Sequence, residues 1–293
     1  MKIMKKIAVA VFAGAMVFGF ASCASGDDPE NAIKGSGKKY SIDYTNEGSS
    51  IYRAFSKTAL EHAGAAVKID FLDVNADTKG AGVMGIIFDY YEKKDVKSFN
   101  VIGVKTTDAN GNLGFYVSRF ENVTDQQDEN FGAWTKKDEN GNVVEKGPAK
   151  ETEYVKAFTK AQGVKDAENK VTVYAYVIEK KNTENDNWNY YVYLLNNTIA
   201  KLDSEGNLVD DAGKQVDLSS ETPLATIPVY KDDGITLYEN AKSPKQNRLA
   251  VYANIYPTEE SGADPKKVTI GCGTLKGKWE YCGDYKEVGV DED

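Results

Sequence analysis

The sequence predicts an all-β protein built as a two-sheet antiparallel β-sandwich with one short helix. From about Tyr40 onward, runs of β-branched and aromatic residues alternate with clusters of Gly, Asn and Asp, a pattern typical of strands and turns. Tyrosine is abundant, with 18 copies in 293 residues, and suits half-buried pleated surfaces. The clearest hairpin, Val171–Lys180 with Trp188–Asn196, carries apolar or aromatic side chains on both faces. Neither face of the hairpin is then expected to be fully exposed to solvent, which favours a sandwich over an open sheet.

The N-terminal segment has the composition of an export signal. Lys2, Lys5 and Lys6 form a positively charged start, followed by Ile7–Phe20, a run of 14 apolar or glycine residues. This run is shorter than the roughly 20 residues that a membrane-spanning helix needs. A charged start, an apolar middle and small residues before Cys23 together predict a secretory signal peptide.

The end of this segment, Phe20-Ala21-Ser22-Cys23, resembles the lipobox of bacterial lipoproteins, in a looser form similar to that of spirochaete lipoproteins. The resemblance implies cleavage of residues 1–22, lipidation of Cys23, and a place in the bacterial cell envelope, at the outer membrane or cell surface. A plain secreted protein with an incidental cysteine is the alternative. Removal of residues 1–22 takes away three lysines and no acids, so the formal net charge falls from −9 to −12.

Residues 23–39 are predicted to be the lipidated cysteine and a flexible tether. They are rich in Gly, Ser, Asp and Pro and contain little that could be buried. Residues 40–293 are then expected to form a single β-sandwich domain, joined to the membrane through the lipid on Cys23.

Strands are expected where an apolar or aromatic run lies between turn residues. The expected strands are Ala65–Val74, Gly82–Tyr91, Ser98–Lys105, Leu113–Phe120, Val171–Lys180, Trp188–Asn196, Leu224–Tyr230, Ile235–Tyr238, Arg248–Tyr256 and Lys267–Leu275. Ser50–Ala63 is the expected helix, because apolar residues recur at helical spacing behind a serine N-cap. Thr152–Ala161 fits either a strand or a short helix.

One turn pattern, D-x-[NE]-G-N, occurs three times, at Asp108–Asn112, Asp138–Asn142 and Asp203–Asn207. Asp bonds its own backbone and Gly supplies positive φ, so each pattern predicts a hairpin turn. Calcium loops are the alternative interpretation, although Gly stands at the fourth place here and at the sixth in an EF-hand.

The strand pair Ala65–Asp73 and Gly82–Asp89 resembles the central pair of concanavalin A-like sandwiches, the superfamily of lectins, laminin-G domains and glucanases. Ser98–Lys105 and Leu113–Phe120 continue the meander as in that superfamily. The resemblance implies a jelly-roll sandwich, with other sandwiches and barrels as alternatives. It implies no activity, because one fold serves many functions.

Composition and motifs argue against several kinds of chemistry. An acidic chain without a basic tract is repelled by phosphates, so no nucleic-acid partner is expected. A lone His62, no Cys-x-x-Cys and no Gly-x-Ser-x-Gly argue against an ordinary zinc site and a nucleophilic triad. The nearest match to the glucanase E-x-D-x-x-E strand, Glu184 to Asn189, ends in Asn and lies in a loop. We therefore expect no catalytic residue, metal or cofactor, and no enzyme.

Cys272 and Cys282 are the two thiols left once Cys23 is lipidated. They flank Gly277 symmetrically, so a hairpin centred there would place them opposite each other. Export makes a disulfide between them possible; two reduced, partly buried thiols are the alternative.

Aromatic side chains are the best binding candidates, because sugars stack on exposed rings. The candidates are Trp134, Trp188, Tyr190, Tyr191 and Trp279. Ordinary cross-strand or core packing is the alternative for each of them. The expected function is a non-enzymatic binding module, with carbohydrate as ligand. The alternatives are a structural or adhesin-type lipoprotein that binds a host protein, and a glycoside hydrolase.

Overall fold

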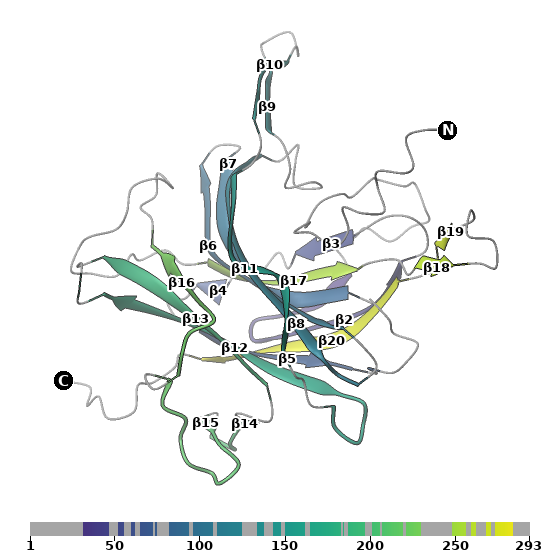
Figure 1. Cartoon of the computed structure of the whole chain (residues 1–293), viewed down its shortest axis with the longest axis vertical. Helices are drawn as coiled ribbons and strands as arrows, with labels where there is room; N and C mark the ends of the chain where they lie inside the picture. Colours follow the sequence, from purple (N-terminus) through teal and green to yellow (C-terminus); the bar gives the residue numbers. More distant parts are fainter. Residues whose placement is uncertain are drawn as a thin grey trace.

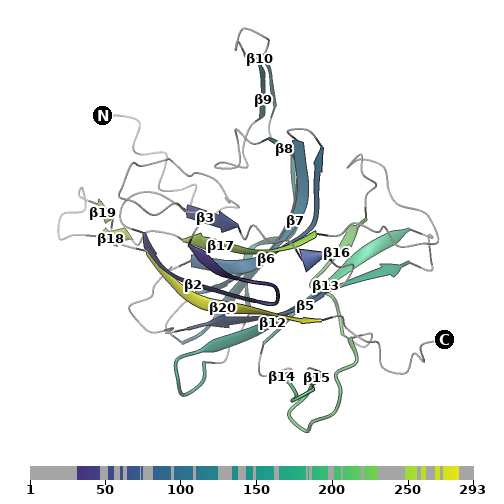
Figure 2. The same ribbon diagram turned by 180° about the vertical axis from the view of Figure 1, so that it is seen from behind.

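The structure is a computed structural model, drawn in Figure 1 and from behind in Figure 2. It describes residues 32–46, 52–55, 60–61, 65–72, 74, 82–93, 96–107, 110–124, 134–137, 143–147, 150–161, 165–182, 184, 187–196, 201–205, 207–218, 221–229, 248–255, 259–261, 268–270 and 273–283.

Two antiparallel sheets make up most of the fold, which confirms the all-β prediction. The first, here called the seven-stranded sheet, has the order β1 (Ile33–Ser36), β2 (Lys39–Asn46), β20 (Gly273–Gly283), β5 (Ala65–Phe71), β12 (Val171–Lys181), β13 (Trp188–Asn196) and β16 (Ala225–Pro228). The second sheet has the order β11 (Lys150–Ala161), β8 (Leu113–Thr124), β7 (Val96–Thr106), β6 (Gly82–Lys93), β17 (Arg248–Ile255) and β3 (Tyr52–Phe55), and β4 (Leu60–Glu61) also pairs with β17.

Three small strand pairs lie outside these sheets. They are β9 (Trp134–Lys137) with β10 (Val143–Gly147), β14 (Lys201–Leu202) with β15 (Leu208–Val209), and β18 (Glu259–Ser261) with β19 (Val268–Ile270). In both views the β9–β10 hairpin projects away from the two sheets, whereas β14 and β15 lie on the side of β12 (Figures 1 and 2).

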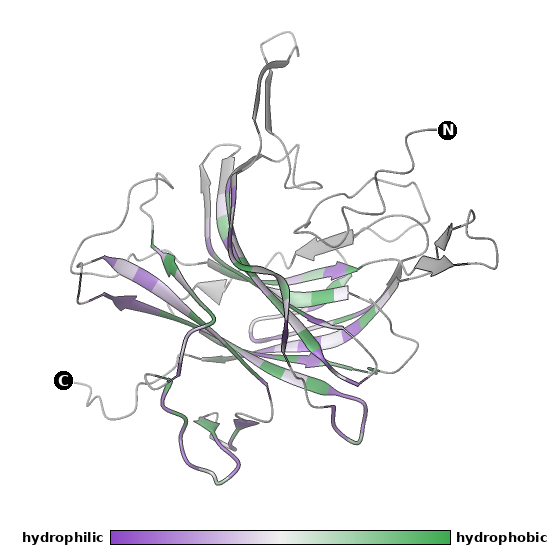
Figure 3. Ribbon diagram, in the orientation of Figure 1, coloured by the Kyte–Doolittle hydropathy of each residue, from purple (hydrophilic) through white to green (hydrophobic). Residues whose placement is uncertain are grey.

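The main core lies between the two sheets. Alternation along β12 turns Val171, Val173, Ala175 and Val177 inward, as the sequence pattern predicts. Figure 3 shows this change of hydropathy along the strands. Trp279 links the layers directly, because its indole Nε1 donates a hydrogen bond of 2.9 Å to the carbonyl oxygen of Gly85 in the second sheet.

Most expected strands are confirmed, with shifts of a few residues at their ends. They correspond to β5, β6, β7, β8, β12, β13, β16 and β17. Thr152–Ala161 belongs to a strand, β11, and Lys267–Leu275 is divided between β19 and the start of β20. Ile235–Tyr238 lies outside the described residues.

The expected helix at Ser50–Ala63 is wrong. Its described parts are β3 and β4, which pair antiparallel with β17 through Tyr52↔Ile255 and Leu60↔Leu249, among others. Local helical spacing is a weak preference, and hydrogen bonds to a distant strand override it. Among the described residues there is no α-helix.

The predicted tether is wrong in its second half. Ile33–Ser36 forms β1, the chain turns through Gly37 at φ 64°, and the register Ile33↔Ile42 to Ser36↔Lys39 pairs β1 with β2. The described part of the sandwich therefore includes Ala32, whose side chain joins the main core. Cys23 and the rest of the tether lie outside the described residues.

The hairpin expected around Gly277 is also wrong. β20 runs without a turn from Gly273 to Gly283, and Gly277 pairs with Ile42 on one side and Phe71 on the other. At about 3.3 Å per residue, Gly273 and Cys282 are roughly 30 Å apart, whereas a disulfide needs Cα atoms about 6 Å apart. Cys282 has a free thiol, and Cys272 lies outside the described residues.

The turn at Asp203–Asn207 is confirmed as a hairpin turn between β14 and β15. Asp203 Oδ1 accepts hydrogen bonds of 2.8 Å from the amides of Glu205 and Asn207. Asp166 and Asp210 make the same pair of bonds in turns that the pattern did not identify. At the first predicted turn, the amide of Thr107 donates to the carbonyl of Asn112; Asp138–Asn142 lies outside the described residues.

Gly277→Ala tests the continuous strand. A Cβ at this position would collide with Met84 and lie 2.7 Å from the carbonyl oxygen of Asp70. We expect a loss of about 1–3 kcal/mol in the free energy of unfolding, measured in urea, because the backbone cannot move cheaply. Thr274→Ala, at an exposed position of the same strand, should change it by at most about 0.5 kcal/mol. Equal stability of Gly277→Ala and wild type would contradict the packed strand.

Candidate functional site

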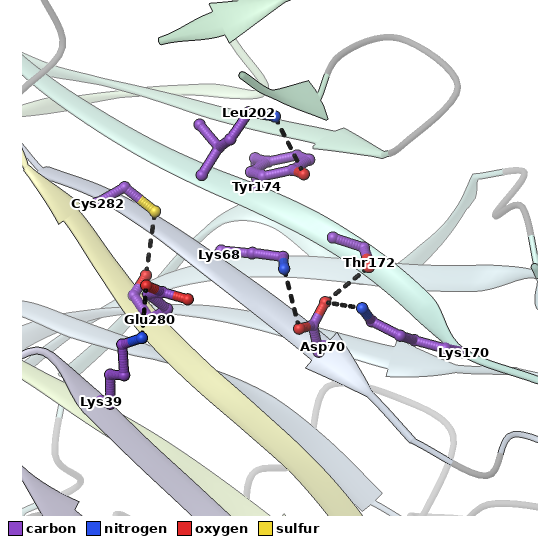
Figure 4. A network of polar contacts seen from close by, with 9 residues as sticks. All are labelled: Lys39, Lys68, Asp70, Lys170, Thr172, Tyr174, Leu202, Glu280 and Cys282. Atoms are coloured by element: carbon purple, nitrogen blue, oxygen red, sulfur yellow. Dashed lines mark hydrogen bonds and ion pairs between the residues drawn. The ribbon is translucent and has the colours of Figure 1, made fainter. Parts of the chain in front are cut away.

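A polar network on the outer face of the seven-stranded sheet is the first candidate site (Figure 4). Asp70 is at its centre: its Oδ1 accepts a hydrogen bond of 2.6 Å from the hydroxyl of Thr172 and lies 3.5 Å from the Lys170 ammonium. Its Oδ2 lies 3.2 Å from the ammonium of Lys68. The register Asp70↔Thr172 between β5 and β12 brings these side chains together, since directly opposed residues share a face.

The network holds its charges in a half-buried position. The side chains of Asp70, Lys68 and Lys170 are 12%, 23% and 28% exposed. Burial acts to lower the pKa of Lys68, but the charge and hydrogen bond of Asp70 prevail and raise it above its ordinary value. One carboxylate thus faces two ammonium groups, and the group carries an excess positive charge.

Tyr174 and Cys282 lie beside the network on the same face (Figure 4). The Tyr174 hydroxyl accepts a hydrogen bond of 3.3 Å from the amide of Leu202, and burial raises its pKa. The Cys282 thiol donates to the carbonyl oxygen of Glu280 at 3.3 Å. Burial raises the pKa of Cys282 to about 11, so the sulfur stays protonated and a poor nucleophile near neutral pH.

A second apolar cluster covers the part of this face next to the network. Leu208 and Leu218, from the segment that includes β14 and β15, pack on outward-facing residues of β12 and β13. Those outward-facing residues are Tyr174, Tyr176, Tyr193 and Leu195. The half-buried polar network is therefore bordered on this side by tyrosines that the cluster covers.

The structure does not bring the predicted aromatic residues together. Trp279 and Tyr190 are core residues, each 1% exposed, so neither ring offers a face to a ligand. Tyr190 packs edge-on against Phe88 at 5.4 Å between ring centroids. Trp188 also turns inward and packs partly buried on the main core, whereas Tyr191 faces outward beside the covered tyrosines.

Alternation along β13 explains this separation, because neighbouring residues point to opposite faces. Trp134 lies at the start of β9, but its side chain is outside the described part of the structure. His62 is outside it as well.

A second candidate site, which sequence reasoning missed, lies between the sheets. Arg119 on β8 donates from Nη1 to Asp89 at 3.2 Å and to Asn100 at 3.4 Å, and from Nε to Glu121 at 3.0 Å. Arg119 and Glu121 follow Val117 at two-residue intervals and so point inward with it. The sequence signal that could have identified this cluster is the presence of charged residues at strand positions that point inward.

This cluster is enclosed. The side chains of Arg119, Asp89 and Glu121 are only 3%, 14% and 10% exposed. Burial raises the pKa of Asp89 to about 6, against the lowering effect of Arg119 and of hydrogen bonds from Tyr190 and Asn100. Both carboxylates bind one guanidinium, so the cluster is a buried ionic group. Removing one partner of such a group strongly destabilises the folded protein, because a buried charge is left unpaired.

Neither candidate has the composition of a metal centre. Among the described residues, no group of three or more His, Cys, Asp or Glu side chains could hold a metal ion. In the same part of the chain, no helix is long and apolar enough to cross a membrane. Compared with models of known protein families and with curated proteins, the chain matches none.

Asp89→Asn tests the enclosed cluster through pH. The folded state holds the Asp89 proton more tightly than the unfolded state, so this group favours folding most below about pH 4 and least above its folded pKa. We expect the wild-type free energy of unfolding, measured in urea relative to Asp89→Asn, to fall by roughly 3 kcal/mol between about pH 4 and pH 7.

The matched control is Asp43→Asn, because the Asp43 side chain is 76% exposed. This variant also removes one carboxylate but leaves the enclosed cluster intact. Parallel pH profiles of wild type and Asp89→Asn would show that Asp89 does not titrate as an enclosed group.

Proposed function

We propose that this protein is a lipid-anchored lipoprotein of the bacterial cell envelope whose β-sandwich is a non-enzymatic binding module for carbohydrate. The observation that supports the binding role best is the network around Asp70. It presents a carboxylate, two ammonium groups and a hydroxyl on one face of a sheet, next to tyrosine side chains.

These groups match the chemistry of sugar hydroxyls. A carboxylate accepts hydrogen bonds, ammonium groups donate them, and a threonine hydroxyl can do both. Ligand sites commonly combine a few fixed polar groups with apolar or aromatic walls, and Tyr191 is a partly exposed ring on this face. The neighbouring charges fix the Asp70 carboxylate before a ligand arrives, which reduces the ordering cost of binding.

The fold agrees with the carbohydrate hypothesis without requiring it. The resemblance to concanavalin A-like sandwiches was based first on a pair formed by Ala65–Asp73 and Gly82–Asp89, and this pairing is wrong: β5 pairs with β20 and β12 in one sheet, and β6 pairs with β7 and β17 in the other. The rest of the expected meander, β6, β7 and β8, is antiparallel. We propose a jelly roll of that kind as the finer description of the sandwich. Since one fold serves many functions, the side chains on the surface, and not the fold, determine what the protein binds.

The anchor is the second part of the proposal. The lipobox-like residues end at Cys23, and the described part of the sandwich begins at Ala32. If the residues between them formed a flexible chain, as their composition predicts, they would span about 15–18 Å. The binding module would therefore lie close to the membrane that holds the lipid.

A protein-binding, adhesin-type role is the second candidate. The observation that favours it is the β9–β10 hairpin, which projects beyond the two sheets (Figure 1). A glycoside hydrolase has less support, because the acids Asp89 and Glu121 both bind Arg119 and are only 14% and 10% exposed.

Cys23→Ser tests the anchor. We expect the wild-type chain, produced in a bacterial host, to incorporate an alkyne-labelled fatty acid and to partition into detergent, because the cysteine sulfur carries the lipid. Cys23→Ser should do neither, whereas Cys282→Ser should behave as wild type. An unlabelled wild type, or a labelled Cys23→Ser, would refute lipidation at this position.

Asp70→Asn tests the binding face. A glycan array probed with the detergent-solubilised full chain should identify at least one saccharide ligand. Titration should then show about tenfold weaker binding for Asp70→Asn, because the variant loses a charge-assisted acceptor. Glu153→Gln, an exposed position on β11, serves as the control. Absence of any saccharide ligand, or equal binding by a folded Asp70→Asn, would contradict the proposal.

A further inference from the structure

We infer that the outer face of the seven-stranded sheet selects anionic saccharides, meaning chains that bear carboxylate or sulfate groups. This inference rests on the proposed function and names the ligand class for the same face. It goes beyond sugar binding because the charge of the face, and not only its hydrogen-bonding groups, decides what is bound.

The part of this face formed by β1, β2, β20 and β5 carries a charge opposite to that of the chain. Outward-facing side chains of β1, β2, β20 and β5, with the residue before β12, include the lysines Lys34, Lys39, Lys68, Lys170, Lys276 and Lys278. The acids among them are Asp43, Asp70 and Glu280. Three positive charges are therefore in excess on a chain whose formal net charge is −9.

Strand register arranges part of this charge in a row. Lys34 lies opposite Ser41, Ser41 opposite Lys278, and Lys278 opposite Asp70. Neighbouring strands are about 4.8 Å apart, so Lys34 and Lys278 start about 10 Å from each other. Both side chains are exposed, and the row leads directly to the Asp70 network.

The acids on this face do not neutralise all of its lysines. Glu280 pairs with Lys39 at 3.3 Å and Asp43 with Lys276 at 3.5 Å, while Asp70 has two lysine partners. Among the described residues, Lys34 and Lys278 have no ion-pair partner. The two exposed pairs are weak, since ion pairs in water contribute at most about 1 kcal/mol, so a ligand anion can compete for their lysines.

The type of cation fits this ligand class. Lysine ammonium groups are compact point charges with rotatable donors, and they suit separate carboxylate or sulfate groups along a flexible chain. Tyr191, which is partly exposed on the same face, offers a ring for sugar contact that a purely ionic surface lacks. An anionic membrane surface is the competing partner, because β1 follows the proposed anchor closely.

A matched pair of polymers tests the selectivity. Dextran sulfate and dextran share a backbone and differ in charge, and each is titrated into the detergent-solubilised full chain. We expect dextran sulfate to bind at least about tenfold more tightly than dextran. The double variant Lys34→Gln/Lys278→Gln should lose about tenfold in affinity for dextran sulfate and nothing for dextran.

The control is Lys160→Gln, which removes an exposed lysine from β11 in the second sheet. It is compared with Lys278→Gln alone, and an equal loss of dextran sulfate affinity in these two single variants would overturn the assignment to this face. Equal binding of the two polymers would overturn charge selection while leaving sugar binding intact, whereas binding of neither would overturn both proposals.

A vesicle-binding assay distinguishes an anionic membrane from an anionic saccharide as the partner of this face. Vesicles of phosphatidylglycerol and phosphatidylcholine should bind the soluble Cys23→Ser chain no more tightly than vesicles of phosphatidylcholine alone. Two results together would assign the face to the membrane and overturn the inference. The first is tighter binding to the phosphatidylglycerol vesicles that is lost in Lys34→Gln/Lys278→Gln. The second is an unchanged affinity of this double variant for dextran sulfate.

Discussion

Strand register across the seven-stranded sheet is the constraint on which the other features depend. Ile42, Gly277 and Phe71 share one cross-strand row, and Ser41, Lys278 and Asp70 form the next. The first row turns inward to the core and the second outward. A slip of one residue would exchange these faces, so burial of the apolar row also fixes the place of every charge on the outer surface.

Local pattern was enough to predict the strands whose information lies in consecutive residues. Val171–Lys181 and Trp188–Asn196 alternate clearly and are joined by a short polar loop, so their pairing could be inferred. The helix at Ser50–Ala63 failed because the hydrogen bonds of Tyr52–Phe55 go to β17, far along the chain. Gly277 was misassigned for the same reason, since the packing against Met84 that excludes a side chain there involves a distant strand.

The candidate sites were harder to predict because each joins distant segments. Asp70 and Thr172 are separated by 102 residues, and Asp89 and Arg119 by 30. No spacing along the chain links these pairs; only the register does. The aromatic candidates show a second limit of the sequence. Residue type identified Trp279 and Tyr190 as binding candidates, but it could not predict that both rings lie on the inner face.

The position of β20 has a consequence for the time course of folding. Its strand ends at Gly283, yet it occupies the interior of the sheet, between β2 and β5. Until Gly273–Gly283 has been synthesised, β2 and β5 have no connection through the sheet, and Gly85 lacks the indole donor of Trp279. Contacts of such long sequence separation form slowly. The two halves of the seven-stranded sheet therefore join late in folding, because the strand that connects them is far along the chain from both of its neighbours.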